Sequence, residues 1–390
     1  MNLPSWRADT PACEKQFHFN NAGASLMPLP VQQAIHNHIQ LEADRGGYEA
    51  ADIAETDVEA FYGSMDKLLN CGASNIAFTS SATNSFARAL SCIPFKQGDK
   101  ILITNEDYIS NQLAFLSIKK RFGIDVIRAT SLPEGGVDIV DLKRLMRLHK
   151  PILVSVTHVP TNSGLVQPIE EIGKLCKEFE ITYLVDACQS VGQLPLDVNK
   201  IQCDFLSGTF RKFLRGPRGA GFLFVSDRIL KLGWEPLFID MRGAVWTSAN
   251  AYEQDKTAKR FEDWEIPYAL LLGSKTAVDY SLNIGLKTIQ ERNAFLAESL
   301  RSQLSSIGLH SLDLGKNPCA IVTVYHKTWN LNQLKVHLQS HKVNFSISQG
   351  DYAVIDFATK QVPWALRLSP HYFNTEEEIK NVIEILKNFR

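Results

Sequence analysis

The sequence has little surplus charge of either sign and no long hydrophobic run. Its 41 Lys and Arg residues nearly balance 42 Asp and Glu residues, so the formal net charge is −1. Because a general nucleic-acid binder needs a basic surplus on one face, this balance argues against that class. No apolar run approaches the roughly 18 residues of a membrane-spanning helix, and the first residues lack the apolar segment of a secretory signal. We therefore expect neither nucleic acid nor a membrane as a partner.

The sequence also lacks the motifs of disulfide frameworks, zinc sites and dinucleotide-binding folds. Its seven cysteines are an odd number, widely scattered and without a CxxC pair, which is typical of reduced thiols in a cytoplasmic protein. The ten histidines are dispersed, so we expect no metal site. No GxGxxG follows a candidate first strand, which argues against a dehydrogenase.

Short apolar runs alternate with amphipathic helical patterns from about residue 75 to 225, which predicts an α/β fold with a mostly parallel, seven-stranded sheet flanked by helices. The candidate strands cover residues 76–79, 100–104, 124–129, 152–157, 182–186, 205–207 and 221–225, and the candidate helices cover 84–92, 111–121, 138–148 and 168–179.

A long helical pattern runs from about residue 258 to 304. A smaller α+β part follows, with candidate elements at 320–325, 331–339, 353–356 and 365–368 and a last helix from 375. We expect a large domain of residues 20–255, and a small domain that combines residues 1–19 with 256–390.

Three polar segments follow candidate strands, where the ligands of parallel sheets bind. In SGTFRKFLRGPRGAGFLFV (207–225), Lys212 lies among Arg211, Arg215 and Arg218. Neighbouring cations lower the pKa of a lysine and favour a nucleophilic amine. The alternative is a solvated basic turn.

The two other segments supply an acid and a candidate anion site. In ITYLVDACQSVGQLP (181–195), Asp186 ends a buried strand, where its carboxylate needs a protonated nitrogen or a metal as partner, or caps the next turn. In FTSSATNSFARAL (78–90), small hydroxylated residues open a helix. Such a helix start can bind phosphate, although ordinary helix capping is the competing interpretation.

Taken together and in this order, these segments resemble the fold-type-I pyridoxal 5′-phosphate (PLP) enzymes, and more narrowly the class V aminotransferase and cysteine desulfurase family. The resemblance extends over nearly the whole chain. FNNAGASLMPLPV (19–31) matches the family's opening NNAG, and ALRLSPHYFNTEEEI (365–379) matches its closing pattern of an arginine, Ser-Pro and an aromatic-Asn-Thr-Glu-Glu run.

The resemblance implies roles for residues around the cofactor. Lys212 would form the Schiff base and shuttle the substrate's α-proton, and Asp186 would keep the pyridine nitrogen protonated. Gln189 would contact the phenolic oxygen. The matching phosphate-binding positions are Ala82, Thr83, Thr209 and Arg211, the last of which replaces the histidine usual in desulfurases.

Further positions follow from the same resemblance. Tyr108 aligns with the ring-stacking residue, and the cofactor-oxygen contact falls on Asn162 or, one residue earlier, on Thr161. Arg367 matches the arginine that binds the substrate α-carboxylate. The remaining expected contacts are Asn21 and Tyr48 for substrate, and Trp246 and Thr247 from a partner subunit, since the family is dimeric with shared sites.

The sequence narrows the reaction without fixing it. Desulfurases of the persulfide type need a cysteine shortly before the carboxylate-binding arginine, yet none lies between Cys319 and Arg367. The RKFLRGPRG and GGYEAAD segments resemble the C–S lyase and epimerase-like branch, which favours β-elimination on a cysteine-derived substrate. An aminotransferase, an isopenicillin N epimerase-like enzyme and, more remotely, a non-catalytic PLP-binding regulator are the alternatives.

Overall fold

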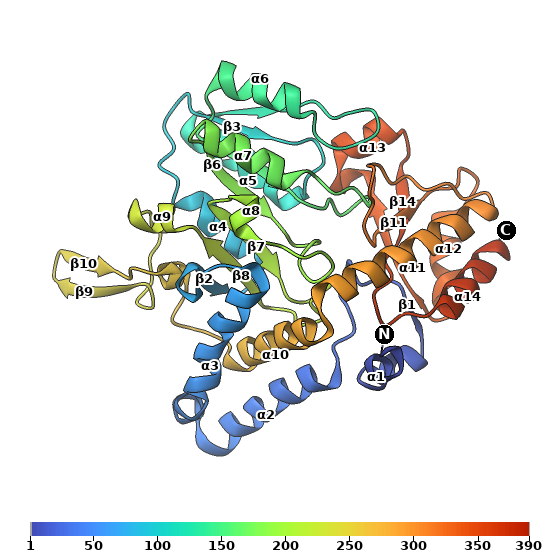
Figure 1. Cartoon of the computed structure of the whole chain (residues 1–390), viewed down its shortest axis with the longest axis horizontal. Helices are drawn as coiled ribbons and strands as arrows, with labels where there is room; N and C mark the ends of the chain where they lie inside the picture. Colours follow the sequence, from blue (N-terminus) through green and yellow to red (C-terminus); the bar gives the residue numbers. More distant parts are fainter. Residues whose placement is uncertain (1, 390) are drawn as a thin grey trace.

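A seven-stranded sheet forms the centre of the computed structural model, which describes residues 2–389 (Figure 1). Its strands lie in the order β2-β8-β7-β6-β5-β3-β4. Their bounds are β2 Ile76–Thr79, β3 Lys100–Ile103, β4 Asp125–Arg128, β5 Leu153–Thr157, β6 Thr182–Asp186, β7 Phe205–Thr209 and β8 Gly221–Val225. All seven candidate strands of the sequence therefore join one sheet.

The sheet is mostly parallel, which confirms the predicted fold class. Only β8 runs antiparallel, to both of its neighbours, β2 and β7. In the register of β5 and β6, Thr157 lies opposite Asp186. The carboxyl ends of the parallel strands thus bring these polar residues to one edge of the sheet.

Helices cover both faces of the sheet. The helices α4 Ala82–Ser91, α5 Ile109–Phe122 and α9 Asp227–Lys231, with the 3₁₀ turn η3 Ala258–Phe261, share one apolar cluster with the sheet. On the other face, a second cluster joins the sheet to α3 Gly47–Leu69, α6 Ile139–His149, α7 Ile169–Glu178, α8 Val198–Ile201 and α10 Tyr268–Ile284.

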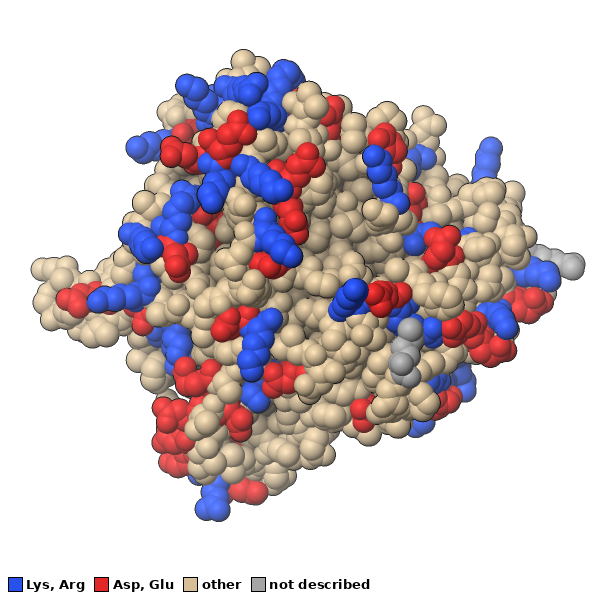
Figure 2. Space-filling view, viewed as in Figure 1, with Lys and Arg blue, Asp and Glu red and all other residues tan. Residues whose placement is uncertain are grey.

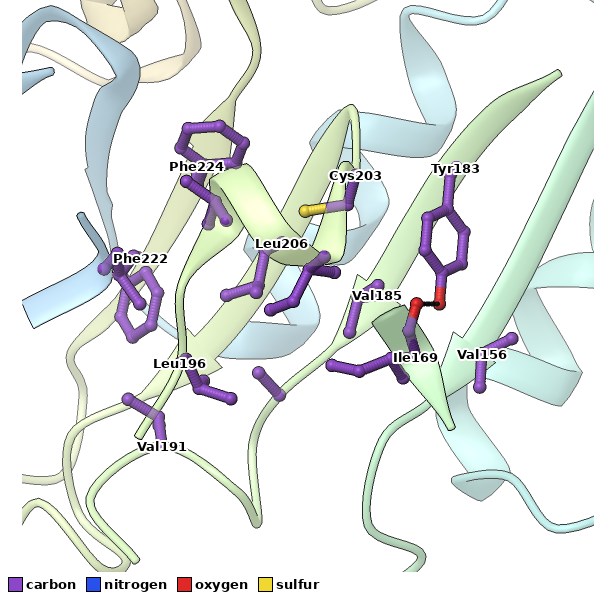
Figure 3. Close-up of a cluster of buried hydrophobic side chains, with 14 of the residues drawn as sticks. Val156, Ile169, Tyr183, Val185, Val191, Leu196, Cys203, Leu206, Phe222 and Phe224 are labelled. Carbon is purple, nitrogen blue, oxygen red and sulfur yellow. Dashed lines mark hydrogen bonds between the residues drawn. The ribbon is translucent and has the colours of Figure 1, made fainter. Parts of the chain in front are cut away.

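Figure 3 shows part of this second cluster, where side chains of adjacent strands point toward the covering helices. Val185 and Leu206 are fully buried there. The buried hydroxyl of Tyr183 donates a hydrogen bond of 3.2 Å to the carbonyl of Ile169, so the ring's polar end is satisfied. Apolar burial on both faces explains the continuous hydrophobic runs of the parallel strands.

The long helical pattern of residues 258–304 is not one helix. The turn η3, α10 and α11 Leu286–Ser306 share this stretch, and Gly285 separates the two long helices with a φ of 91°. Glycine adopts this left-handed region without a steric penalty, so the chain turns there. α10 packs against α2 Leu29–Arg45, where a Cβ at Gly273 would lie 2.5 Å from Ile35.

A smaller α+β part follows. Its three-stranded sheet has the order β11-β14-β13, formed by β11 Val322–Val324, β13 Ser346–Gln349 and β14 Trp364–Leu368. A second pair joins β1 Phe17–His18 to β12 Val343–Asn344. Around them lie α12 Leu331–Ser340, η4 Gly350–Tyr352, α13 Val354–Lys360 and α14 Glu376–Lys387, so the candidate element at 353–356 is the start of a helix.

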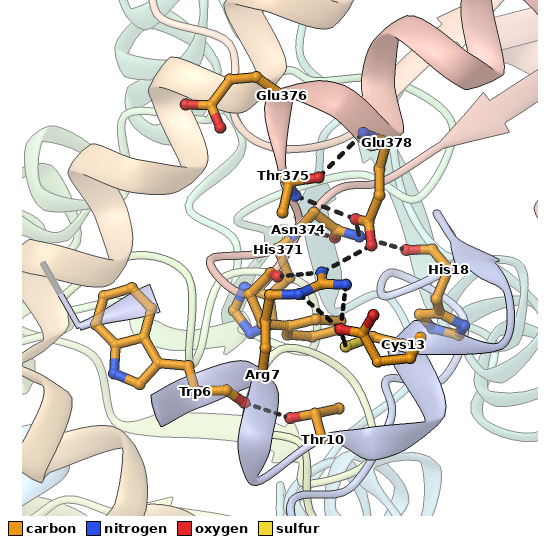
Figure 4. A network of polar contacts seen from close by, with 12 residues as sticks. Trp6, Arg7, Thr10, Cys13, His18, His371, Asn374, Thr375, Glu376 and Glu378 are labelled. Carbon is orange, nitrogen blue, oxygen red and sulfur yellow. Dashed lines mark hydrogen bonds and ion pairs between the residues drawn. The ribbon is translucent and has the colours of Figure 1, made fainter. Parts of the chain in front are cut away.

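The N-terminal segment packs against the C-terminal helix (Figure 4). It contains α1 Leu3–Ala8 and the short turn η1 Pro11–Glu14. Arg7 donates to Glu378 at 2.7 Å, and Thr375 caps α14 by accepting from the backbone N–H of Glu378. We propose on these contacts that residues 1–19 belong with 256–390 in one domain and that 20–255 form the other.

The remaining strands, β9 Ala244–Ser248 and β10 Ala251–Gln254, form a hairpin that projects from the body of the molecule (Figure 1). On the face drawn in Figure 2, acidic and basic side chains are interspersed, in keeping with the balanced net charge. All seven cysteines are free. Within residues 2–389, no helix has the length and apolar character needed to cross a membrane, and no group of acidic, His and Cys side chains has the arrangement of a metal site.

Candidate active site

One cavity at the carboxyl edge of the sheet collects most of the predicted site residues. It is lined by Ser81, Ala82, Thr83, Tyr108, Thr157, Val159, Thr161, Asp186, Cys188, Gln189, Thr209, Arg211 and Lys212. These residues come from five separate segments, which meet because they lie at the carboxyl ends of β2, β3, β5, β6 and β7 of the same sheet.

Asp186 ends β6 and is held at both carboxylate oxygens. Its Oδ1 accepts from the backbone N–H of Cys188 at 2.9 Å, and its Oδ2 accepts from Asn111 Nδ2 at 2.9 Å. The residue is only 4% exposed and has no cation among these partners. A buried carboxylate of this kind can pair with a protonated heterocyclic nitrogen.

Lys212 lies in the turn after β7 and is 7% exposed. Burial, with smaller contributions from Arg211 and Arg367, lowers the pKa of its amine to about 8, against the opposing effects of Cys188 and Asp186. Arg215, which the sequence places beside the lysine, turns away: its φ is 61° and its guanidinium donates to Leu26 O and Tyr372 Oη. Desolvation, more than the run of neighbouring cations, therefore produces the reactive amine.

The start of α4, which also lines the cavity, can hold an anion. Ser81 caps α4 by accepting from the N–H of Asn84 at 3.1 Å, and Ala82 and Thr83 form the first turn. A Cβ at Gly221 would lie 2.6 Å from the nitrogen of Ala82, so only glycine lets β8 approach this turn so closely. Free N–H groups at a helix start attract phosphate.

Two more candidate donors to a phosphate, Thr209 and Arg211, line the same cavity. Thr209 ends β7 with its hydroxyl 3.3 Å from the carbonyl of Ala220, and Arg211 contacts the carbonyl of Gly23. A guanidinium can bind phosphate through two parallel hydrogen bonds.

Arg367 lies on β14, the central strand of the small sheet, and is 5% exposed. Its guanidinium donates to Thr161 O at 3.2 Å and to Asn20 Oδ1 at 3.4 Å, and its buried Nε has no partner. No carboxylate within residues 2–389 forms an ion pair with it, and burial lowers its pKa to about 10. A buried cation without an anion is prepared for an anionic ligand.

The structure gives the surroundings of three further predicted cofactor contacts. Tyr108, at the start of α5, lines the cavity and is 36% exposed. Gln189 donates to Thr161 Oγ1 at 3.1 Å, while its buried Oε1 has no partner. Of the two residues left open by the sequence, Thr161 lines the cavity, whereas Asn162 lies on the other side of the chain in a second cavity with Pro160.

Besides Asn162 and Arg367, four predicted residues do not line the cavity. Asn21 is fully buried with its side chain bound to Ser369 O at 2.8 Å and Ser25 Oγ at 2.6 Å, so Asn20 is the residue that contacts Arg367. The others are exposed: Tyr48 at the start of α3, and Trp246 and Thr247 on the β9–β10 hairpin.

Sequence reasoning missed several polar residues beside Asp186. Asn111, Asp107 and Thr157 form hydrogen bonds next to its carboxylate, and Cys188 lines the cavity. Asp107 and Asn111 belong to NEDYISNQ (105–112), a polar run directly after a candidate strand. That position was the feature of the sequence that could have indicated them.

Comparison with known proteins shows the family to which the chain belongs. The model of the family described as Aminotransferase class-V matches residues 17–382. The chain belongs to the class V aminotransferase family. It is therefore an enzyme of a PLP-dependent family, as the resemblance implied.

Relatives with related names cover almost the whole chain. A probable cysteine desulfurase of Methanothermobacter thermautotrophicus is 28% identical, over 99% of this chain and 98% of the relative. A probable hercynylcysteine sulfoxide lyase of Mycobacterium tuberculosis is 24% identical, over 98% of this chain and 92% of the relative.

Solved structures share the fold. The apo structure of a cysteine desulfurase from Thermococcus onnurineus has a TM-score of 0.91 at 22% identity, and covers 98% of this chain and 97% of its own. A complex of a cystine C–S lyase with cysteine persulfide has a TM-score of 0.87 at 21% identity, and covers 97% and 99%.

The donor set of the cavity fits PLP. A buried amine, a buried carboxylate and a phosphate cradle line the same space. These groups match the aldehyde, the ring nitrogen and the phosphate of the cofactor.

Proposed function

We propose that the protein catalyses β-elimination from a cysteine-derived amino acid and releases a thiol, pyruvate and ammonia. The observation that carries this proposal is the buried, unpaired Arg367 guanidinium beside the Lys212 cavity. Its charge and forked donors fit the α-carboxylate of an amino acid.

Lys212 is the base of the reaction. Its amine, whose pKa burial lowers to about 8, would carry the cofactor and then accept the proton from the substrate's α-carbon. Bound PLP supplies an electron sink for the carbanion that this proton transfer creates. The Cβ–S bond then breaks with its electron pair going to sulfur, and water converts the remaining enamine to pyruvate and ammonia.

The other residues bind and orient. Asp186 would hold a proton on the pyridine nitrogen, Gln189 would contact the phenolic oxygen and Tyr108 would stack on the ring. Ala82, Thr83, Thr209 and Arg211 would bind the phosphate. The shared location of these side chains in one cavity supports these roles.

The positions of the thiols favour elimination over sulfane transfer. The segment from β13 to α13, which precedes Arg367 in the chain, contains no cysteine. Cys319 is 5% exposed just before β11, and burial raises its pKa to about 12, so it is a poor nucleophile. Transamination and epimerisation start from the same proton transfer and are our alternatives, because no residue of the cavity excludes them.

We also propose a cytoplasmic homodimer. The β9–β10 hairpin exposes Trp246 to 79% and Val245 to 68%, on two strands that extend away from the core (Figure 1). A second copy would cover these side chains and could bring Thr247 to the neighbouring phosphate end. The seven free cysteines agree with a reducing compartment.

The test is a pyruvate assay on PLP-loaded protein with cysteine thioethers, cysteine sulfoxides, cystine and free L-cysteine. We expect pyruvate from at least one S-substituted cysteine and none from the Lys212→Ala variant, which should keep its fold. Pyruvate from no substrate, with exchange of the α-proton into deuterated water, would replace elimination by epimerisation or transamination. Alanine from free cysteine, with sulfane sulfur that a thiol reductant added to the assay reduces to sulfide, would establish a desulfurase instead.

A further inference from the structure

A second carboxylate, Asp107, lies behind the cofactor cavity and collects four hydrogen-bond donors. It belongs to the loop between β3 and α5. Its Oδ1 accepts from Tyr108 N at 2.7 Å, from Asn111 Nδ2 at 3.0 Å and from the hydroxyl of Thr157, and its Oδ2 accepts from Gln112 Nε2 at 2.8 Å. Every group that forms a hydrogen bond with this carboxylate is therefore a donor.

Asn111 links this carboxylate to the one at the cofactor cavity. Its Nδ2 donates to Asp107 at 3.0 Å and to Asp186 Oδ2 at 2.9 Å. The same Nδ2 also lies 3.4 Å from the hydroxyl oxygen of Thr157. Because an amide NH₂ has two hydrogens, the two shorter bonds to the carboxylates use both of them. Rotation of the amide would break both bonds, which fixes the carboxylate of Asp186 in one orientation.

We propose that Asp107 is a positioning residue that holds Asn111, and through it Asp186, in the orientation that binds a protonated pyridine nitrogen. This inference rests on the role proposed above for Asp186. Asp107 does not line the cofactor cavity, so its effect must pass through its neighbours.

The chemistry requires a carboxylate at position 107. A carboxylate only accepts, whereas the amide of an asparagine would present an NH₂ group to donors that surround it. Burial raises the pKa of Asp107 and its hydrogen bonds from Thr157 and Asn111 lower it, with a net value of about 6, so most of the group is ionised at neutral pH. The hydrogen bonds that it accepts are then charge-assisted.

The network continues away from the cofactor. Arg128 Nη2 donates to Gln112 Oε1 at 2.6 Å, and the other end of that amide donates to Asp107. Gln112 and Arg128 both line the second cavity of about 290 Å³, between α5 and the η4–α13 segment. The side chain of Gln112 therefore reaches Asp107 from outside the cofactor site.

The main experiment is a double-mutant cycle on the affinity of the apoenzyme for PLP, followed by absorbance. Asp107→Asn and Asn111→Ala should each weaken PLP binding about tenfold. If Asp107 acts through Asn111, the double variant should bind PLP no more than about threefold less tightly than the single variant with the lower affinity. Asp125→Asn, the same change at an exposed carboxylate, is the control and should leave the affinity unchanged.

A spectroscopic readout separates positioning from folding. With PLP labelled at its ring nitrogen, the nitrogen NMR shift should indicate a protonated ring in the wild type and move toward the unprotonated value in Asp107→Asn. Should Asp107→Asn fail to fold, Gln112→Met serves instead, because it removes one donor to Asp107 without touching the cofactor cavity. It should shift the same signal in the same direction.

The outcomes separate the two proposals. Wild-type apoenzyme that binds no PLP would overturn both the function and this inference. Normal binding by the wild type, with multiplicative losses in the cycle or with an unchanged ring-nitrogen signal in the variants, would overturn only the role of Asp107.

Discussion

Replacing Arg367 by methionine should separate substrate binding from folding. In the free protein this guanidinium is buried, pairs with no carboxylate and makes only two long hydrogen bonds, of 3.2 and 3.4 Å. Methionine fills a similar space without charge. We therefore expect the free energy of unfolding to change by less than about 1.5 kcal/mol.

The effect on substrate should be much larger. Removing one partner of a buried ion pair costs about 3–5 kcal/mol. To bind a carboxylate, Arg367 must lengthen or share its two existing hydrogen bonds. This cost is absent in the variant and reduces the expected loss of binding free energy by about 1 kcal/mol. A net loss of about 3 kcal/mol corresponds to a rise in KM of about 150-fold at about 1.4 kcal/mol for each factor of ten.

The assay compares KM, kcat and urea unfolding of Arg367→Met with those of Arg292→Met. Arg292 is also buried, but its guanidinium is paired with Glu376 at 2.7 Å and donates to Asn374 O at 2.9 Å. The control should lose stability and keep its KM. An Arg367→Met enzyme with KM within threefold of the wild type would refute the assignment of the α-carboxylate site.

Four further predictions concern the walls of the cavity and the stability of the fold. Gly221→Ala places a Cβ against the first turn of α4, so it should lower the free energy of unfolding by about 1–3 kcal/mol and weaken PLP binding. Gly63→Ala, within α3 and with nothing near its Cβ, should stabilise the protein by about 0.5–1 kcal/mol in the same unfolding assay. In the cofactor-free protein, Lys212 loses its proton near pH 8 when folded and near its ordinary 10.5 when unfolded, so stability relative to Lys212→Met should rise between these pH values and stay level below pH 8. Cys188→Ala should retain pyruvate formation, because burial and the neighbouring Asp186 raise the pKa of this thiol well above its usual range; loss of activity would give Cys188 a chemical role.

The central sheet could be predicted because its strands are buried on both faces. Apolar runs such as those of β6 and β8 stand out from the amphipathic helices between them, and all seven candidate strands pair in the structure. The break at Gly285 was harder to foresee, since a single glycine within a helical pattern is tolerated as often as it ends the helix. The β9–β10 hairpin has too few core contacts to leave a strong hydrophobic pattern.

The site shows where reasoning from motifs loses accuracy. The order of segments along the chain identified the family, but neighbouring positions were harder to tell apart: Thr161 lines the cavity and Asn162 does not, and Arg367 donates to Asn20, the neighbour of the predicted substrate contact Asn21. Asn21, Thr161 and Asn162 lie in turns, and Asn20 directly precedes one. In a turn the direction of each side chain depends on the backbone dihedral angles of that turn, so neighbouring positions are difficult to tell apart from sequence alone.

The pKa of Lys212 shows a second limit of prediction from sequence. The sequence places three arginines near it, and like charges do lower the pKa of an amine. The positive φ of Arg215 turns that side chain toward the N-terminal segment and Tyr372, while burial lowers the pKa of Lys212. Burial depends on how distant segments close over a residue. Because Asp107, Thr157 and Asp186 also meet only through the sheet register, the network that orients the acid could be found only in the folded chain.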